Sequence, residues 1–156
     1  MSGPDWVWLK AQYYQESKLN PKAVSPVGAR GICQAMPGTW ADIQRALGWE
    51  NVSPHSAPHC ILGGAFYQQQ MNKLWKSPRP NLDRHFLALS SYNAGAGNII
   101  KAQKLCGGVA NYDKIIACLY RVTGITFASE TLGYVTNIRK WRLRMANRFA
   151  VREWHH

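Results

Sequence analysis

The sequence has few acidic residues. Eight Asp and Glu stand against nineteen Lys and Arg in a chain of 156 residues, which gives a formal net charge of +11. Any carboxylate that acts as an acid or a base therefore belongs to a short set: Asp5, Glu16, Asp42, Glu50, Asp83, Asp113, Glu130 and Glu153. The charge favours polyanions such as nucleic acid, anionic lipid or anionic cell-wall polymers. The net charge indicates only that a partner would be negatively charged, and it does not distinguish among these three classes.

Long apolar runs and metal-binding spacings are also missing. No stretch is long and apolar enough to cross a membrane, and the N-terminal sequence MSGPDWVWLKAQYYQES lacks the apolar core of a signal peptide. The cysteines contain no CxxC pair, which argues against a structural zinc site. They are compatible with buried thiols, or with two disulfides in one of three connectivities. Proximity in sequence favours Cys33 with Cys60 and Cys106 with Cys118.

What is present indicates a mainly α protein with one domain, residues 1–156. Hydrophobic residues make up 46% of the chain and charged residues 17%, which is typical of a compact fold. Apolar residues recur at helical spacing, and period-two alternation is scarce. We expect helices near residues 4–17, 39–47, 58–75, 82–92, 98–105, 112–122 and 129–152, with Thr39 and Ser129 as N-caps. The last helix should bury the stripe Tyr134, Ile138, Trp141, Met145 and Phe149.

The first predicted helix carries Glu16 close to its C-terminal end. At about 100° per residue, Trp6, Leu9, Tyr13 and Glu16 fall on one face. A carboxyl placed against aromatic rings is desolvated, which raises its pKa toward the range that suits a general acid. The alternative is an ordinary solvated helical glutamate. Composition alone does not separate the two.

Three motifs follow in order along the chain. The first, Glu16 to Thr39, reads ES, LNP, AVS, GARG, Q and MPGT; the second is SYNAGAGNI at 91–99, and the third is ETLGYVTNI at 130–138. In this order and spacing they resemble the lytic transglycosylases of the soluble type, goose-lysozyme-like enzymes that cut the bacterial cell wall. The resemblance implies a mainly α, lysozyme-like catalytic domain over 1–156, with the motifs lining a cleft for a glycan strand.

The same resemblance implies a reaction. Such an enzyme cleaves the β-1,4 bond between N-acetylmuramic acid and N-acetylglucosamine and leaves a 1,6-anhydromuramyl end. Glu16 matches the single catalytic glutamate, which first protonates the glycosidic oxygen and then takes a proton from the C6 hydroxyl. The acetamido group of the sugar replaces the second carboxyl of ordinary glycosidases. No metal or organic cofactor is implied.

Further residues of the first motif match the substrate cleft. Ser17 corresponds to a serine that orients the carboxyl or the sugar, although a hydroxyl at a helix end also bonds back to a backbone carbonyl. Gln34 corresponds to a cleft amide that bonds sugar hydroxyls or the acetamido group. Met36 either lines the cleft or is buried. Gly28 and Gly31 are expected to adopt positive φ and to shape the floor.

The second and third motifs supply the remaining binding residues. The resemblance places Tyr92 near the catalytic carboxyl and Asn93 near the acetamido sugar, while Gly95 also fits a helix cap. Glu130 and Tyr134 lie one helical turn apart and are expected to bind substrate. A glutamate directly after an N-cap at Ser129 has a second explanation, because negative charge at a helix N-terminus offsets the helix dipole.

Some features depart from the family pattern. Ser90 and Ser91 stand where alanines are usual, and Cys33 stands where a larger apolar residue is usual; all three are small enough to fit. No separate wall-binding module is apparent, so affinity for the wall falls to the catalytic domain and its charge. Small size, basic charge and the missing signal peptide favour a monomeric phage endolysin or virion-associated lysin. It would be made in the host cytoplasm and act in the periplasm or cell wall, on peptidoglycan and anionic envelope polymers.

Two other functions fit parts of the sequence. A goose-type muramidase would hydrolyse the same bond with water and would need a second carboxylate, for which Asp42 and Asp83 are the spare acids outside the motifs. A remote alternative is a basic nucleic-acid-binding protein that uses the last helix with Trp141 and Trp154. No nucleic-acid motif supports that alternative, and no specific nucleic acid is expected as a partner.

Overall fold

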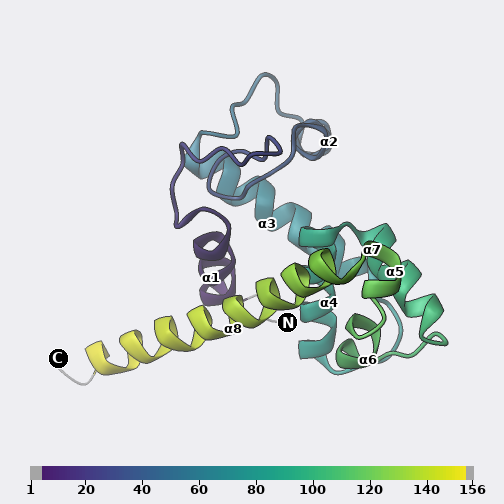
Figure 1. Cartoon of the computed structure of the whole chain (residues 1–156). Helices are drawn as coiled ribbons and strands as arrows, with labels where there is room; N and C mark the ends of the chain where they lie inside the picture. The colour runs from purple at the N-terminus through teal and green to yellow at the C-terminus, as the bar shows by residue number, and fades with distance from the viewer. Residues whose placement is uncertain (1–4, 154–156) are drawn as a thin grey trace. The chain divides into compact units, whose positions relative to one another are not determined.

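The computed structural model describes residues 5–153, with side-chain environments from Asp5 to Arg148. The mainly α prediction is confirmed: the described chain contains helices and no strand (Figure 1). β pairing within it is limited to isolated bridges of Arg30 with Val24 and Ala35. The helices are α1 Trp6–Ser17, α2 Pro37–Leu47, α3 Ala57–Leu74, α4 Asn81–Ala94, α5 Ala96–Leu105, α6 Tyr112–Ile116, α7 Tyr120–Thr123 and α8 Ile125–Glu153.

The chain divides into two compact units. The first comprises residues 1–66 and 137–156, and the second comprises residues 67–136. The division falls inside α3 and α8, so each of these helices contributes to both units. The single domain over 1–156 stays a prediction. Among the described helices, none combines the length and apolar character that a membrane span requires.

Caps at both ends define α1 in the first unit. The Asp5 carboxylate accepts a hydrogen bond from the Val7 amide at 3.1 Å, which satisfies one of the free N–H groups of the first turn. At the other end Lys18 adopts the left-handed conformation with φ of 55°, and its N–H bonds the Tyr14 carbonyl at 2.9 Å. The helix therefore ends at the predicted place, whereas its predicted start at Pro4 lies outside the described residues.

The predicted apolar face of α1 is only partly correct. Tyr13 is buried, and Leu9 and Glu16 are half-buried, but Trp6 is 56% exposed. Trp6 was wrongly assigned because it lies in the first turn of the helix, where burial depends on what the rest of the fold places there. Glu16 thus shares a face with the buried ring of Tyr13, and the aromatic run does not extend to the start of the helix.

Trp141 of α8 contacts three residues at the C-terminal end of α1. The rings of Tyr14 and Trp141 meet edge to face with centroids 4.6 Å apart. The Trp141 indole N–H donates to Gln15 Oε1 at 3.2 Å, and the Lys18 ammonium lies 4.7 Å from the Trp141 ring. These contacts fix the last turn of α1, the turn that carries Glu16. In the predicted stripe of α8, Tyr134 and Ile138 are buried and Trp141 and Met145 are half-buried, while the side chain of Phe149 lies outside the description.

A disulfide and a glycine fix the loop between α1 and α2. Cys33 bonds Cys60 with their Cα atoms 5.7 Å apart, which confirms this predicted pair. Gly31 has φ of +77°, and a Cβ on it would lie 2.0 Å from the Pro54 carbonyl oxygen. No other residue fits there, because both the backbone conformation and the space exclude a side chain. Gly28 also has positive φ, as predicted.

The second unit is a small helical cluster. Helix α4 packs against α5 and α6, and α5 packs against α6 and α7. Among its fully buried apolar side chains are Leu87, Leu89, Ile99, Ile115 and Leu119. The disulfide Cys106–Cys118 joins the end of α5 to the segment before α7, with Cα atoms 6.1 Å apart, and confirms the second predicted pair.

Two predicted helix starts are wrong. Helix α2 begins at Pro37 and not after Thr39, because proline suits the first helical position, where its missing N–H has no partner to lose. Helix α8 begins at Ile125 and not after Ser129, directly following Gly124 with φ of 84°. Glycine permits this turn and lets the helix start one turn earlier than the serine suggested.

The predicted helix 112–122 is interrupted. The N–H of Cys118 bonds the Ile115 carbonyl, and the N–H of Leu119 bonds the Ile116 carbonyl, so residue pairs three apart replace the α-helical pairs four apart. The chain turns more tightly at this point. Cys118 lies within this turn and is there bonded to Cys106.

Adjacent serines in α4 differ in their partners. Ser91 Oγ donates to the Leu87 carbonyl at 2.7 Å and accepts from the Trp75 indole N–H at 3.1 Å. Ser90 Oγ is also fully buried but has no hydrogen-bond partner among the described residues. A buried hydroxyl without a partner lowers stability, because its hydration is lost and not replaced.

We therefore predict opposite effects for two matched substitutions. Ser90→Ala should raise the free energy of unfolding by about 1 kcal/mol, because it removes an unsatisfied polar atom. Ser91→Ala should lower it by about 1 to 2 kcal/mol, because the Trp75 N–H loses its acceptor. Urea unfolding of both variants measures the difference. Equal losses for the two would show that the Ser90 hydroxyl has a partner.

Candidate active site

Glu16 lies in the last turn of α1, half-buried, one turn after Tyr13. The Tyr13 ring is 2% exposed, and its hydroxyl donates to the Ile61 carbonyl at 2.7 Å. Burial, together with the negative charge of Glu16, raises the pKa of Tyr13 well above its usual value. Tyr13 is therefore a neutral, fixed wall beside the carboxyl. Glu16 thus lies one helical turn after a buried aromatic ring and acts on it electrostatically; its predicted packing against an aromatic face stays a prediction.

A glycine of α3 makes the position of Tyr13 possible. A Cβ on Gly64 would lie 2.5 Å from the Tyr13 hydroxyl oxygen and 2.8 Å from Cys33 Cβ. Helix α3 can thus approach both α1 and the disulfide loop only where this side chain is missing. Gly64 did not emerge from the sequence, although a Gly-Gly pair inside a helix is a signal, since each costs about 1 kcal/mol relative to alanine.

Ser17 connects the end of α1 to the following loop. Its Oγ lies 2.9 Å from the Ile32 carbonyl oxygen and 3.3 Å from that of Tyr13. This is the helix-end arrangement that the sequence left open. The hydroxyl proton is directed to backbone, so Ser17 positions the neighbouring Glu16 through the chain and retains only acceptor capacity for a ligand.

Gln34 is held in an unusual backbone conformation by its own side chain. Its φ is +50°, and its Nε2 donates to the carbonyls of Gly31 at 2.9 Å and Ala23 at 3.3 Å. Both amide hydrogens are thus committed to the loop, and Oε1 is without a protein partner among the described residues. Met36 lies at the start of α2 and is 42% exposed, so the buried alternative for it is wrong.

In the second unit, the second motif ends α4. The half-buried ring of Tyr92 meets Tyr67 edge to face, with centroids 5.2 Å apart. The helix stops at Ala94, and Gly95 caps it with φ of 86°, as the helix-end interpretation predicted. Tyr67 was missed from the sequence because it lies in α3, outside every motif.

Asn93 and the third motif meet through Thr131. The Thr131 hydroxyl donates to Asn93 Oδ1 at 2.9 Å, which leaves the exposed Asn93 amide N–H₂ for another acceptor. Glu130, next in the chain to Thr131, is exposed, whereas Tyr134 is 6% exposed. Because α8 begins at Ile125, Glu130 lies beyond the first turn, and the helix-dipole explanation for it is wrong.

The predicted residues thus fall into two groups. Glu16, Ser17, Gln34 and Met36 belong to the first unit. Tyr92, Asn93, Glu130 and Tyr134 belong to the second. Glu16 and Ser17 are adjacent in the chain, as are Tyr92 and Asn93, and the hydrogen bond of Thr131 to Asn93 joins the second motif to the third. Thr131 was overlooked although it lies inside the third motif, where a threonine beside a predicted binding glutamate was a usable signal.

The two spare acids have structural partners. Asp42 is an exposed residue of α2 that pairs with Arg45 at 2.8 Å. Asp83 accepts a hydrogen bond from the Tyr112 amide at 3.1 Å and so caps the start of α6. Asp42 is thus an exposed, ion-paired residue, and the Asp83 carboxylate is committed to a helix end.

This chain belongs to the transglycosylase SLT domain family, whose family model matches residues 1–115. Among its relatives is the membrane-bound lytic murein transglycosylase F of Yersinia pestis, 30% identical over 96% of this chain. The chain spans 32% of the length of that relative, about a third.

Solved structures of the same kind share the fold. The lytic transglycosylase Slt of Pseudomonas aeruginosa, solved as an inactive mutant with glutamine in place of a glutamate, matches 94% of this chain with a TM-score of 0.73 and 26% identity. The 70 kDa soluble lytic transglycosylase of Escherichia coli matches 88% with a TM-score of 0.67 and 26% identity. This chain covers 22% and 21% of those chains.

The contact at Gly64 predicts a matched pair of glycine substitutions. Gly64→Ala should lower the free energy of unfolding by about 1 to 3 kcal/mol, because the methyl group collides with Tyr13 and Cys33. Gly133→Ala in α8, where a Cβ meets nothing within 4 Å, should raise it by about 0.5 to 1 kcal/mol. Thermal and urea unfolding provide the test. A stabilising Gly64→Ala would contradict the close packing of α1 on α3.

The raised pKa of Tyr13 predicts a loss of stability in alkali. The folded protein holds this proton more tightly than the unfolded chain does, so the stabilisation is complete below the unfolded pKa and is lost as pH rises above it. Above about pH 10, unfolding free energy should fall by up to about 1.4 kcal/mol per pH unit from this group. Tyr13→Phe should remove that part of the slope, and Tyr120→Phe, at an exposed ring, should not. Identical slopes in both variants would contradict the assignment.

Proposed function

We propose that this protein is a peptidoglycan lytic transglycosylase that cleaves between N-acetylmuramic acid and N-acetylglucosamine, with Glu16 as its single acid and base. The main support is that the half-buried Glu16, at the start of the first family motif, lies one helical turn after the fixed ring of Tyr13 and acts on it electrostatically. The inactive glutamate-to-glutamine mutant of Slt adds that one glutamate is required in a relative.

The proposed reaction has two steps. Neutral Glu16 donates its proton to the glycosidic oxygen as the bond from C1 to that oxygen breaks, and the acetamido oxygen of the muramic sugar bonds C1. The Glu16 carboxylate then removes the proton from the C6 hydroxyl as that oxygen bonds C1 and the acetamido oxygen leaves. The carboxyl ends in its starting state. No water is consumed, so no second protein carboxylate is needed.

The surroundings of Glu16 suit this cycle. Partial burial disfavours the charged form of a carboxyl, and so does the carbonyl end of a helix, where Glu16 lies. The Tyr13 hydroxyl is already bonded to Ile61 and so does not stabilise the carboxylate by a hydrogen bond of its own. A partly buried carboxyl at such a position suits a group that acts first as an acid and then as a base.

The remaining motif residues are proposed to bind sugar. Oε1 of Gln34 is an acceptor and Nδ2 of Asn93 is a donor, and together they complement hydroxyl and acetamido groups. Met36 and the ring of Tyr92 offer partly exposed apolar surface to the faces of the sugar rings. We further propose that Glu130 binds a sugar hydroxyl, while the buried Tyr134 supports this part of α8.

The place of action is proposed from chemistry. Two disulfides are stable in oxidising compartments, which include the periplasm where peptidoglycan lies. The net charge of +11 should hold the protein near anionic envelope polymers, and this attraction weakens as salt rises. The role as a phage endolysin or virion-associated lysin, and the monomeric state, stay predictions.

The alternatives lack a supporting observation. Hydrolysis would require a water-positioning carboxylate, and both Asp42 and Asp83 are engaged elsewhere. Nucleic-acid stacking on Trp141 is disfavoured, because its ring is already covered by Tyr14, Lys18 and Arg144. Trp154 lies outside the described residues. The masses of released muropeptides separate the enzymatic alternatives, since an anhydro product is one water lighter than a hydrolytic one.

Glu16→Gln should abolish activity. Glutamine has the same shape but cannot release or take up a proton, so the rate of clearing of a peptidoglycan suspension should fall by at least about a hundredfold. The circular dichroism spectrum and the unfolding midpoint should change little. Glu50→Gln is the matched control, because Glu50 is exposed in the same unit and lies outside every motif. Near-normal clearing by Glu16→Gln would refute the role of Glu16.

A further inference from the structure

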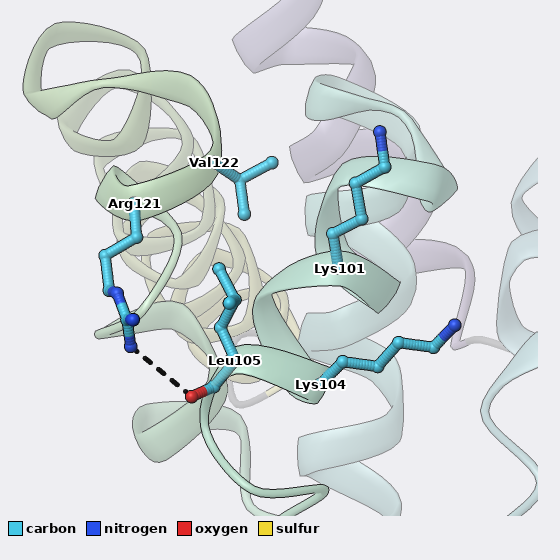
Figure 2. Close-up of a pocket in the computed structure, with 5 residues that line it drawn as sticks. All are labelled: Lys101, Lys104, Leu105, Arg121 and Val122. Carbon is cyan, nitrogen blue, oxygen red and sulfur yellow. Dashed lines mark hydrogen bonds between the residues drawn. The ribbon is translucent and has the colours of Figure 1, made fainter.

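The second unit contains a hollow that the proposed reaction does not use. Lys101, Lys104 and Leu105 of α5 and Arg121 and Val122 of α7 line it, and its volume is about 450 Å³. Figure 2 shows the Leu105 and Val122 side chains facing each other between the two helices, with Lys101 and Lys104 projecting from α5. A volume of this size lies in the range of small-molecule sites, about 300 to 1,000 Å³.

The cations of this hollow have no carboxylate partner. None of the five lining residues is acidic, and among the described residues no ion pair engages Lys101, Lys104 or Arg121. Arg121 is instead oriented by a hydrogen bond from Nη1 to the Leu105 carbonyl at 3.4 Å, which crosses from α7 to α5 (Figure 2). Its other N–H groups are left to bind an anion. The two lysines carry their charge on flexible stems that can turn toward a ligand.

The walls of the hollow are covalently joined. Cys106 directly follows Leu105, and Cys118 precedes Arg121 by three residues, so the disulfide Cys106–Cys118 links the end of α5 to the start of α7. The two helices also pack against each other. The spacing between Leu105 and Val122 is thus a fixed property of the fold. Lysines near a helix C-terminus also offset the helix dipole, but that role explains neither Arg121 nor the apolar floor.

We propose that this hollow binds a short acidic peptide through its carboxylates, with an aliphatic side chain on the floor formed by Leu105 and Val122. Cations at the rim suit carboxylates, and the apolar floor suits a methyl or methylene group next to them, a combination that a bare phosphate lacks. Peptidoglycan carries such peptides: its stems contain D-alanine and acidic residues. The inference rests on the proposed function for this choice of peptide, and it assigns peptide recognition to a surface outside the catalytic motifs.

The test uses the full chain and a synthetic stem peptide, L-alanyl-γ-D-glutamyl-meso-diaminopimelyl-D-alanine. Its binding is followed by NMR through the backbone signals of Leu105 and Val122. The peptide contains no glycosidic bond, so the result does not depend on catalysis; clearing of peptidoglycan by the wild type is measured separately and tests the proposed function alone. The comparison ligands are the same peptide with every carboxylate converted to a carboxamide, and inorganic phosphate.

We expect saturable shifts with the acidic peptide and little response to the carboxamide form or to phosphate. The double variant K101Q/K104Q and the single variant R121Q should each weaken binding about tenfold, a loss of the size expected for charge contacts. The control K73Q/K76Q removes the same charge from exposed lysines of the same unit and should bind normally. Equal binding of the carboxamide peptide, equal binding of phosphate, or equal weakening by K73Q/K76Q would each overturn the proposal.

Discussion

The packing of Tyr13 against α3 is the contact on which the candidate catalytic residue depends. The phenol is buried, bonded to the Ile61 carbonyl, and seated where Gly64 has no side chain. Trp141 holds the same turn of α1 from the other side through Tyr14 and Gln15. The last turn of α1, which carries Glu16, is therefore held by contacts with both α3 and α8. A single acid that must give up and recover one proton benefits from such a fixed position.

Much of this arrangement follows from local rules. Helical periodicity predicted the mainly α fold and most helix ends, and sequence proximity chose the correct disulfide pairs. The motifs predicted Asn93 and Glu130 as binding residues. The Thr131 hydroxyl bonds Asn93, and Glu130 directly precedes Thr131 in the chain, so the second and third motifs meet at this point. These features were predictable because they depend on residues that are close in sequence or on a pattern shared with a family.

Other features depend on which segments meet in space. In the sequence Gly64 is only a residue that weakens a helix. Its role depends on the close packing of α3 on Tyr13 and Cys33, which are distant in the sequence. Trp6 was assigned to a buried face by periodicity alone, yet it is 56% exposed, because periodicity does not reveal where the covering element ends. The break near Cys118 and the early start of α8 reflect tight turns that a helical pattern does not register. The basic hollow joins residues 101–105 to residues 121–122, and no motif links them.

The central claim is that the sugar itself, through its C6 hydroxyl, closes the cleaved end without water. Digestion of purified peptidoglycan in water enriched in heavy oxygen, followed by mass spectrometry of the muramyl ends, tests this directly. Ring closure inside the sugar predicts products that carry no heavy oxygen. Incorporation of one heavy oxygen atom at the new muramyl end would mean that water attacked C1, and the enzyme would then be a hydrolase.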